Sequence, residues 1–300
     1  MQEFKIPHSR RQALLGTLAL LVSTTMFASL PLFGAVGAQQ GVGPAMASLL
    51  RFGLPALLLG FLLPVALGKG RGGRVYVGFG MLTGAGVWGY LYASTHLSLF
   101  TVLPLYFSWP LFLFFLRWFT GRHRASKALP AAAALLSLLG VVLCALQAQE
   151  HGTGEALPAL AAGLIGPISY AVLSSQKELP VPYLSGVSVA ACVFLGGTIA
   201  SAALLFASGE AIALPQRNMG WLAVFGVMLL SGLVPQLLFT VGTHATPKHL
   251  LEHACLFELL GAFLLAVLFL EDWPKRLDGL GLICCAAALA LSRERAKPQA

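Results

Sequence analysis

The sequence predicts an all-α polytopic membrane protein of ten transmembrane helices, arranged as two inverted five-helix repeats. The first observation is composition: of 300 residues, 57% are hydrophobic and only 10% are charged, whereas a soluble domain has about 25% charged residues. The second is a series of long apolar runs separated by short loops. The third is the distribution of lysine and arginine among those loops.

The apolar runs are each close to the roughly 20 residues that a helix needs to cross a bilayer. We place the predicted spans at 14–36, 44–67, 75–95, 98–119, 127–147, 156–176, 183–208, 219–243, 248–270 and 276–292. The loops between them are short, so we expect no attached soluble domain.

The amino terminus resembles a twin-arginine export signal, because Arg10-Arg11 precedes an apolar run. A cleavage site needs a small-x-small pattern, and Val36-Gly37-Ala38 fits that pattern poorly. We therefore expect a retained first helix, anchored in the cytoplasm by Lys5, Arg10 and Arg11.

The basic residues test this arrangement of spans. With a cytoplasmic amino terminus, 15 of the 19 lysines and arginines fall in inside segments, 3 fall in outside segments, and Arg51 lies within a span. Because cytoplasmic loops of membrane proteins carry the excess of lysine and arginine, both termini are predicted to be cytoplasmic.

Ten spans divide into two units of five, at 1–147 and 156–292, and an odd number of helices per unit inverts the second unit. Inverted repeats are common in transporters, with the substrate site between the halves near mid-membrane. A weak internal sequence similarity supports this division. Tyr92–His96 ends the third span and Phe239–His244 ends the eighth, and both stretches end in Thr-His. His96 would then lie at the outer face and His244 at the inner face.

A longer pattern also occurs in both halves. A helix ending in small and hydroxyl residues is followed by a tight turn, a long helix and a glycine-containing last helix. The residues that carry it are Tyr90–His96, Trp109-Pro110 and Gly140 in the first half, and Phe239–His244, Leu250–Leu270, Glu271, Gly279 and Gly281 in the second.

Over its whole length the chain thereby resembles the drug/metabolite transporter superfamily, in its EamA-like branch. It is most similar to the bacterial exporters of aromatic and other neutral amino acids. The resemblance implies a multi-pass protein of the bacterial cytoplasmic membrane that exports amino acids by alternating access. The alternative within the same superfamily is a permease for another small metabolite, drug or nucleotide sugar. The chain departs from the family pattern at Arg117–Arg124, which is basic rather than acidic, and at Glu258-Leu259, where Glu-Pro is frequent.

The ninth span carries acidic residues at membrane depth, where charge is costly and normally faces a protein interior or a water-filled path. Glu252 and His253 are near its cytoplasmic end, whereas Glu258 is deeper. We expect Glu258 to contact a substrate amino group or to act as a protonatable site; the alternative is a buried structural acid, neutral or paired with Arg51.

Arg51 is a basic residue well inside a span. It could bind a substrate carboxylate through two parallel hydrogen bonds, or pair with Glu258. The alternative is that its side chain extends to the outer interface, about 10 Å away.

Aromatic residues supply the other candidate substrate contacts. Trp88, Tyr92 and His96 are spaced four apart, so they form one stripe on the third span, which could line a cavity or belong to the interfacial aromatic belt. Tyr106 and Trp109 lie near the middle of the fourth span, where Pro104 and Pro110 predict a break that is either substrate-facing or only a structural kink. Further candidates, or satisfied helix interior, are Pro167, Tyr170 and Pro235 in the second half.

Gly80 and Gly84 form a GxxxG motif that predicts close helix packing. The sequence has no HExxH motif, paired catalytic acids, nucleotide-binding motif or zinc spacing among its five cysteines, so we expect neither an enzyme nor a bound cofactor or metal. The expected partners are a small-molecule substrate and the bilayer, without nucleic acid. The sequence leaves open a monomer or a homodimer, the driving ion, the direction of transport and a non-transporting scaffold.

Overall fold

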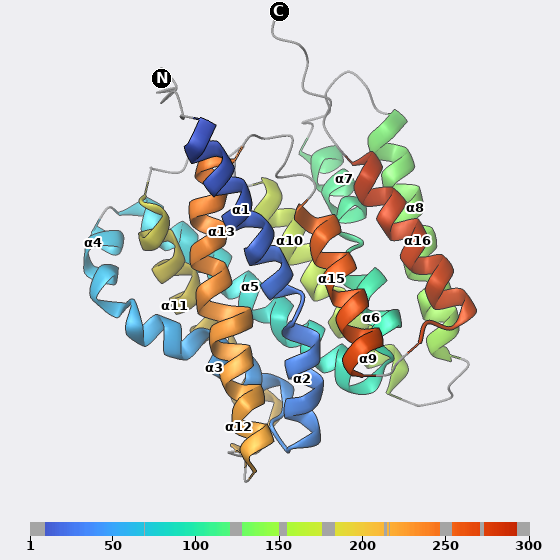
Figure 1. Ribbon diagram of the computed structural model, residues 1–300, viewed down its shortest axis with the longest axis horizontal. Helices are drawn as coiled ribbons and strands as arrows, with labels where there is room; N and C mark the ends of the chain where they lie inside the picture. Colours follow the sequence, from blue (N-terminus) through green and yellow to red (C-terminus); the bar gives the residue numbers. More distant parts are fainter. Residues whose placement is uncertain are drawn as a thin grey trace, which may run out of the picture.

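All regular secondary structure in the described part of the chain is helical. The computed structural model describes residues 10–68, 70–120, 128–149, 155–175, 184–212, 215, 217–246, 254–270 and 273–292. Figure 1 shows the helices, which are α1 (Arg10–Phe27), α2 (Leu30–Gln39), α3 (Pro44–Leu58), η1 (Gly60–Leu62), α4 (Leu63–Gly68), α5 (Arg71–His96), α6 (Leu99–Tyr106), α7 (Trp109–Phe119), α8 (Ala128–Gln149), α9 (Ala156–Gly163), α10 (Ile165–Ser175), α11 (Gly186–Ser208), α12 (Asn218–Phe225), η3 (Gly226–Leu233), α13 (Val234–Ala245), α15 (Ala254–Phe269) and α16 (Arg276–Leu291).

Several helices have the dimensions of membrane spans. Five stretches of the described residues are both long and apolar enough to cross a membrane: Leu14–Gln39, Leu99–Phe119, Ala128–Gln149, Gly186–Ser208 and Asn218–Thr240. A sixth, formed by Pro44–Leu58 and Gly60–Gly68, is bent by 59°. Each of the ten predicted ranges holds one helix or a run of consecutive helices, but α15 and α16 have only 16 residues each. The fold is therefore that of an all-helical membrane protein, and the count of ten spans stays a prediction.

Prolines begin several of the helices that follow a break. Pro31 lies in the first turn of α2, and Pro110 in the first turn of α7. A proline lacks the backbone N–H and fixes φ, so it fits the first turn of a new helix and interrupts an existing one. The predicted break in the fourth span is confirmed between Tyr106 and Trp109, where Ser108 donates its hydroxyl to the Leu105 carbonyl at 2.6 Å.

Glycines bring α5 and α11 into backbone contact, as the GxxxG motif predicted. A Cβ atom on Gly84 would lie 2.8 Å from the Cα of Gly197, and one on Gly80 would collide with the Val193 carbonyl. The contact can form only because these positions have no side chain. The two helices therefore pack as a backbone-to-backbone seam, which we call the α5–α11 seam.

A second close pair joins α8 and α16, one from each half of the chain. A Cβ atom on Gly140 would lie 2.7 Å from the Cys285 sulfur, and one on Gly281 would lie 2.7 Å from the Cys144 sulfur. Each helix thus presents a glycine to a cysteine of the other, so the contact is reciprocal. Gly140 and Gly281 are the glycines of the pattern found in both halves of the sequence.

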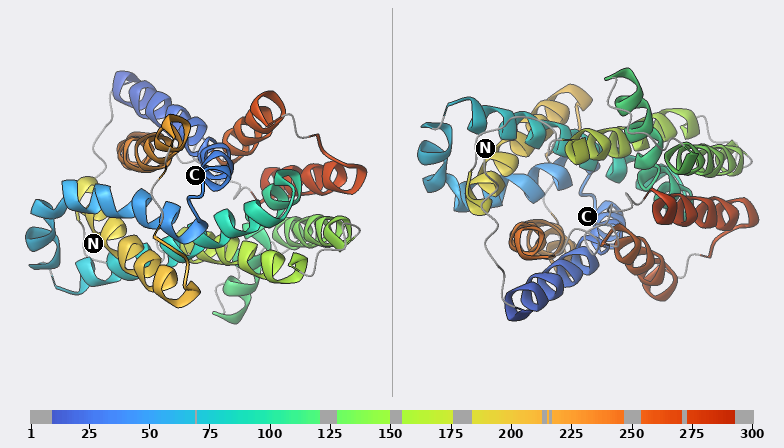
Figure 2. Two further views of the ribbon diagram at one scale, coloured as in Figure 1. Left: turned by 90° about the horizontal axis from the view of Figure 1, so that it is seen from below. Right: turned by 90° about the horizontal axis from the view of Figure 1, so that it is seen from above.

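Helices of each half pack against helices of the other half, so the two halves do not form separate bodies. α5 of the first half packs against α9 and α10 of the second, and α13 of the second half packs against α1 of the first. The pair α3 and α11 and the pair α8 and α16 also join the halves. Figure 2 shows the same interleaving from below and above, with α1, α13 and α15 gathered on one side of the molecule.

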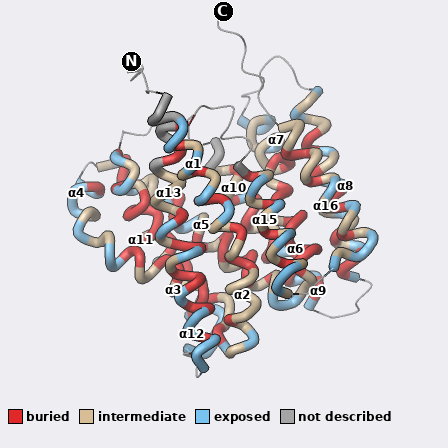
Figure 3. Tube along the Cα trace, in the orientation of Figure 1, coloured by how far each residue is buried: buried red, intermediate tan, exposed pale blue. Residues whose placement is uncertain are grey.

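Burial follows the pattern of a protein surrounded by lipid. Buried residues gather on the inner sides of the helices, and peripheral faces are exposed (Figure 3). The exposed residues include large apolar ones, such as Leu57 at 80% and Phe206 at 92%. In a bilayer these side chains contact lipid tails without cost. Figure 1 places the start of α1 and the end of α16 at the same end of the molecule, which agrees with the expectation of two termini on one side.

A carboxylate ties the end of α11 to the start of α3. Glu210 accepts hydrogen bonds from the backbone N–H groups of Ala45 at 3.0 Å and Met46 at 2.9 Å. These donors are among the first N–H groups of α3, which have no partner within the helix, and a negative charge is favourable at a helix amino terminus. Glu210 therefore holds together two helices that belong to different halves.

Candidate substrate site

Seven side chains from six helices form the group that we call the central cluster. Six of them are near enough to interact electrostatically, and the seventh, Trp109, joins them through its ring contact with Tyr170. The members are Arg51 of α3, Tyr90 of α5, Tyr106 of α6, Trp109 of α7, Tyr170 of α10, and Cys255 and Glu258 of α15. Both halves of the chain contribute, because α3, α5, α6 and α7 precede residue 147 and α10 and α15 follow it.

Arg51 is buried inside the protein, with 7% of its surface exposed. Its guanidinium carbon lies 5.6 Å from the ring centre of Phe27 and 5.8 Å from that of Phe52. One of its terminal nitrogens, Nη1, has no hydrogen-bond partner in the described part of the chain. The side chain therefore does not extend to an interface, and it keeps an unused donor in the interior.

Glu258 is half-buried and interacts electrostatically with Arg51 and Tyr106. No ion pair or hydrogen bond joins its carboxylate to the Arg51 guanidinium, although the structure describes both groups. The opposite charges therefore act on each other without direct contact. Glu252 and His253, the other polar residues of this span, lie outside the described residues.

Aromatic rings line the cluster on both sides of the break between α6 and α7. The Tyr90 and Tyr106 ring centres lie 4.8 Å apart, and those of Trp109 and Tyr170 lie 5.3 Å apart. The Tyr170 hydroxyl is 3.1 Å from the Cys255 sulfur, one helical turn before Glu258. The predicted residues Arg51, Tyr106, Trp109, Tyr170 and Glu258 are thus brought together.

Trp109 resembles Arg51 in having an unused donor. Its indole nitrogen, Nε1, is buried and has no hydrogen-bond partner. Among the described residues, these two are the buried side-chain nitrogens without a partner. Buried donors in native proteins are nearly always paired, and those left unpaired often mark a ligand or water site. Both lie in the same cluster.

The stripe on α5 lies on a different face from the cluster. Trp88 stacks on Tyr92 with ring centres 5.5 Å apart, and Tyr92 contacts His96 at 4.4 Å. His96 is exposed, and its Nδ1 lies 2.8 Å from the Tyr92 carbonyl oxygen. Tyr90 is two residues from both Trp88 and Tyr92, about 200° around the helix. The predicted stripe is a continuous stack of rings, but the structure does not bring it together with Arg51 and Glu258.

Two members of the cluster are absent from the residues predicted as substrate contacts. Tyr90 is 4% exposed, and the sequence alone does not distinguish it because α5 carries aromatic residues on both faces. Cys255 is buried at 7% exposure, and its sulfur meets the Tyr170 hydroxyl. The sequence signal that could have found it is its position three residues before Glu258 on the same helix.

A π-helical segment, η3, packs against Arg51. A Cβ atom on Gly232 would lie 3.2 Å from the Arg51 carbonyl oxygen and 3.3 Å from its Cγ. At the other end of η3, Gly226 packs closely against the Phe33 ring. π-Helical turns are rare and occur frequently at functional sites. The wide π-helical turns of η3 thus lie directly beside Arg51.

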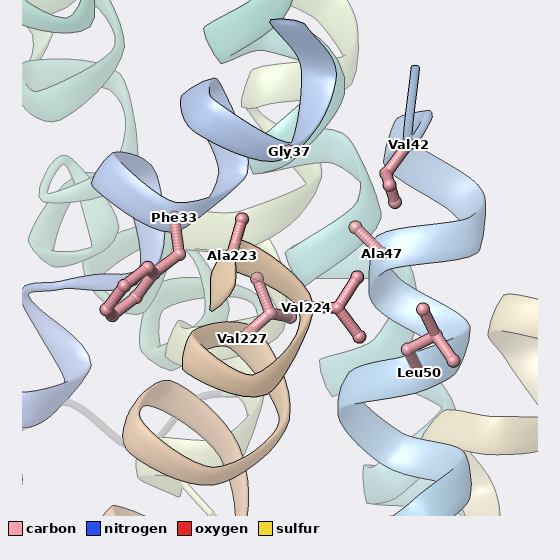
Figure 4. Close-up of a pocket in the computed structure, with 8 residues that line it drawn as sticks. All are labelled: Phe33, Gly37, Val42, Ala47, Leu50, Ala223, Val224 and Val227. Atoms are coloured by element: carbon pink, nitrogen blue, oxygen red, sulfur yellow. The ribbon is translucent and has the colours of Figure 1, made fainter. Parts of the chain in front are cut away.

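A small crevice lies among α2, α3, α12 and the start of η3. Figure 4 shows the eight residues that line it: Phe33, Gly37, Val42, Ala47, Leu50, Ala223, Val224 and Val227. Their side chains are all apolar, and none belongs to the central cluster. The crevice is thus distinct from the candidate substrate site and offers no group that would bind a charged ligand.

The described residues contain no group of three or more His, Cys, Asp or Glu that could hold a metal ion. The five cysteines are free, and four of them are buried. Two of these cysteines make side-chain hydrogen bonds: the Cys255 sulfur lies 3.1 Å from the Tyr170 hydroxyl, and the Cys285 thiol donates to the Pro104 carbonyl at 3.3 Å.

The helices and their apolar faces define the class of this chain, an all-helical membrane protein. No protein-family model matches the sequence, and neither does any curated protein. The chain is similar to a solved structure described as "Crystal structure of protein", with a TM-score of 0.57 and 21% identity over 95% of this chain and 98% of that one. At this identity the likeness shows a shared fold alone.

Proposed function

We propose that this protein is a secondary transporter that exports neutral amino acids, including aromatic ones, across the bacterial cytoplasmic membrane by alternating access. The observation that carries the proposal is the central cluster. Within the described residues, a buried cation with an unused donor and an acid that makes no direct contact with it lie among the same aromatic rings. This arrangement fits a small molecule that brings one negative and one positive group.

An amino acid zwitterion matches the two charges. Its carboxylate would accept hydrogen bonds from Arg51, whose planar guanidinium suits that geometry. Its ammonium group would be held by Glu258. The rings of Tyr90, Tyr106, Trp109 and Tyr170 would contact the apolar part of the substrate. Binding would then satisfy the Arg51 donor and bridge two charges that do not touch.

The backbone around the cluster supports a transport role. The α6–α7 break separates Tyr106 from Trp109, and η3 adjoins Arg51. In transporters, broken helices near the membrane centre form the substrate site, because their irregular backbone lines a cavity. Such breaks also let parts of a helix move separately, as alternating access requires.

The exchange of partners between the halves supports the inverted-repeat proposal. In the predicted repeats, the third span corresponds to the eighth and the sixth to the first. The contact of α5 with α9 and α10 therefore has an equivalent in the contact of α13 with α1. The α8–α16 pair and the α3–α11 pair each join two equivalent spans, one from each half. This is the pattern expected of two similar units related by a two-fold axis in the membrane plane.

The main rival is a transporter of another metabolite, a drug or a nucleotide sugar. Phosphorylated substrates favour several cations at the site, and the central cluster contains one, Arg51. The cluster therefore favours a zwitterion over a polyanion. An enzyme is disfavoured because the thiol of the cluster, Cys255, has the Tyr170 hydroxyl rather than a base as its hydrogen-bond partner.

Uptake into proteoliposomes tests the proposal. We expect saturable uptake of labelled tryptophan, phenylalanine, methionine and threonine, compared with a nucleotide sugar and a cationic dye. Each would be measured with and without a pH gradient, since the response to the gradient shows whether protons drive the cycle. Uptake of the dye or the nucleotide sugar alone would replace the substrate class, and uptake of none of the compounds would favour a scaffold.

A further inference from the structure

We propose that Trp109 selects the substrate's side chain by donating a hydrogen bond from its indole N–H to an oxygen on that side chain. This inference rests on the proposed function and adds a substrate preference to it. The favoured substrates would be neutral amino acids whose side chain carries a hydroxyl or carbonyl oxygen, such as threonine or tyrosine.

The indole nitrogen of Trp109 is the first observation. It is buried, and it has no hydrogen-bond partner among the residues that the structure describes. A buried tryptophan normally places its N–H against an acceptor, because an unmade hydrogen bond in the interior is costly. The indole N–H is a donor only, so its partner must be an acceptor, and an oxygen is the common one.

The position of Trp109 assigns this donor to the side chain of the substrate. Arg51 lies between Phe27 and Phe52, whereas Trp109 contacts Tyr170 on the side of the cluster formed by α10 and α15. With Arg51 holding the carboxylate and Glu258 the ammonium group, the Trp109 donor is left for the remaining substituent.

The surroundings of Trp109 suit an amphipathic side chain. The Trp109 and Tyr170 rings give an apolar wall, and among the described residues the partner of the Tyr170 hydroxyl is the Cys255 thiol, at 3.1 Å. A thiol is a weak hydrogen-bonding group. A substrate oxygen beside Trp109 would accept a hydrogen bond from the indole N–H and lie near the Tyr170 hydroxyl, which can reorient. A methyl group in the same position would leave the indole N–H unpaired.

A site built to hydrogen-bond a substrate group discriminates strongly against the analogue that lacks it. Matched pairs of amino acids isolate this effect, because threonine and valine have nearly the same shape, and tyrosine differs from phenylalanine by one hydroxyl. We expect wild-type protein to transport threonine over valine and tyrosine over phenylalanine by about 10-fold in kcat/KM, as one hydrogen bond to a buried donor would give.

The test compares these ratios in Trp109→Phe, which keeps an aromatic ring against Tyr170 and removes the N–H. Both ratios are expected to fall to within about 2-fold of one, with valine and phenylalanine transport changed less than the two oxygen-bearing substrates. The control is Trp118→Phe on the same helix, where the tryptophan is 59% exposed, and its ratios should equal those of wild type.

The outcomes separate this inference from the function on which it rests. If wild-type protein transports no amino acid, the proposed function fails and the role of Trp109 fails with it. If it transports amino acids without preference within either pair, only the role of Trp109 fails, and this result needs no variant. An equal loss of all four substrates in Trp109→Phe, at normal protein abundance, would also overturn the inference because it would indicate packing rather than recognition.

Discussion

Burying the charge of Arg51 costs free energy, and the residues around it offset that cost only in part. Desolvating a charged side chain costs several kcal/mol, whereas each contact with an aromatic face returns about 0.5–2 kcal/mol. Phe27 and Phe52 supply two such contacts, and Glu258 acts without direct contact. The empty site thus holds an under-compensated charge, so a carboxylate ligand should stabilise the folded protein by binding there.

Removing the Arg51 donors should weaken recognition of the carboxylate specifically. Arg51→Met keeps much of the side-chain volume, and we expect it to raise KM for a neutral amino acid by about 10- to 100-fold, the value of a hydrogen bond to a charged group. The corresponding amino acid amide lacks the carboxylate. It should be a poor substrate for wild type and no poorer for Arg51→Met.

Glu258→Gln provides the complementary measurement, because it should weaken binding of the ammonium group while leaving the difference between acid and amide in place. Glu155→Gln is the matched control, since Glu155 is exposed at the start of α9 and its side chain caps no backbone N–H. Equal losses for the acid and the amide in Arg51→Met would contradict the assigned role. Thermal unfolding of each variant distinguishes lost binding from lost folding.

The sequence was informative where a polar residue interrupts an apolar run. Arg51 and Glu258 stand out for this reason, and prolines mark the region of Tyr106 and Trp109. Tyr90 could not be chosen over Trp88, because α5 is aromatic on both faces and only its neighbours decide which face looks inward. Residue type therefore predicted the charged part of the cluster, and tertiary packing determined the rest.

At the scale of single helices, breaks caused by proline could be predicted, whereas η3 could not. Gly226–Leu233 contains no proline, and its hydropathy is that of an ordinary span. Its π geometry coincides with close approaches at both ends, of Gly226 to Phe33 and of Gly232 to Arg51. Such contacts join residues far apart in the chain and leave no local pattern. The capping of α3 by Glu210 was missed for the same reason.

The α5–α11 seam makes a prediction about stability. Gly84→Ala would place a methyl group 2.8 Å from the Gly197 backbone, so the helices must separate. We expect a loss of about 1–3 kcal/mol, the usual cost of overpacking, measured as unfolding in mixed detergent micelles with increasing denaturing detergent.

Gly78→Ala is the control for this change, because it lies on the same helix and a Cβ there meets nothing within 4 Å. It should leave stability unchanged or raise it slightly, since alanine favours helix more than glycine does. Similar unfolding curves for the two variants would show that the seam does not depend on backbone contact.

For the whole molecule, hydropathy and charge predicted the class and a division into two fives, but not how the fives combine. The halves at 1–147 and 156–292 follow each other in the sequence, and in the structure their helices pack against one another. The reason is that apolar helix faces in a membrane protein carry little information about their partners. The glycine and cysteine side chains at the α8–α16 contact favour the pairing of these two helices, but this preference acts only when both helices are in place.

The inverted arrangement predicts that equivalent helix ends lie on opposite sides of the membrane. Phe119 ends α7, and Trp273 follows α15, which are the last helices of the predicted fourth and ninth spans. Both are well exposed, at 83% and 69%. In a variant without native cysteines, a membrane-impermeant maleimide should label Phe119→Cys only from the cytoplasmic side and Trp273→Cys only from outside. Labelling of both from one side would rule out the inversion.

The contact between α1 and α13 has a consequence for the order of biogenesis. The Ser23 hydroxyl donates to the Pro235 carbonyl at 2.7 Å, across 212 residues of sequence. At synthesis rates of about 5–20 residues per second, α1 waits about 10–40 s for its partner to leave the ribosome. During that time its inward face must be sheltered by lipid, by other helices or by the insertion machinery. The first helix made is therefore among the last to reach its final environment, and slow translation would prolong its most vulnerable stage.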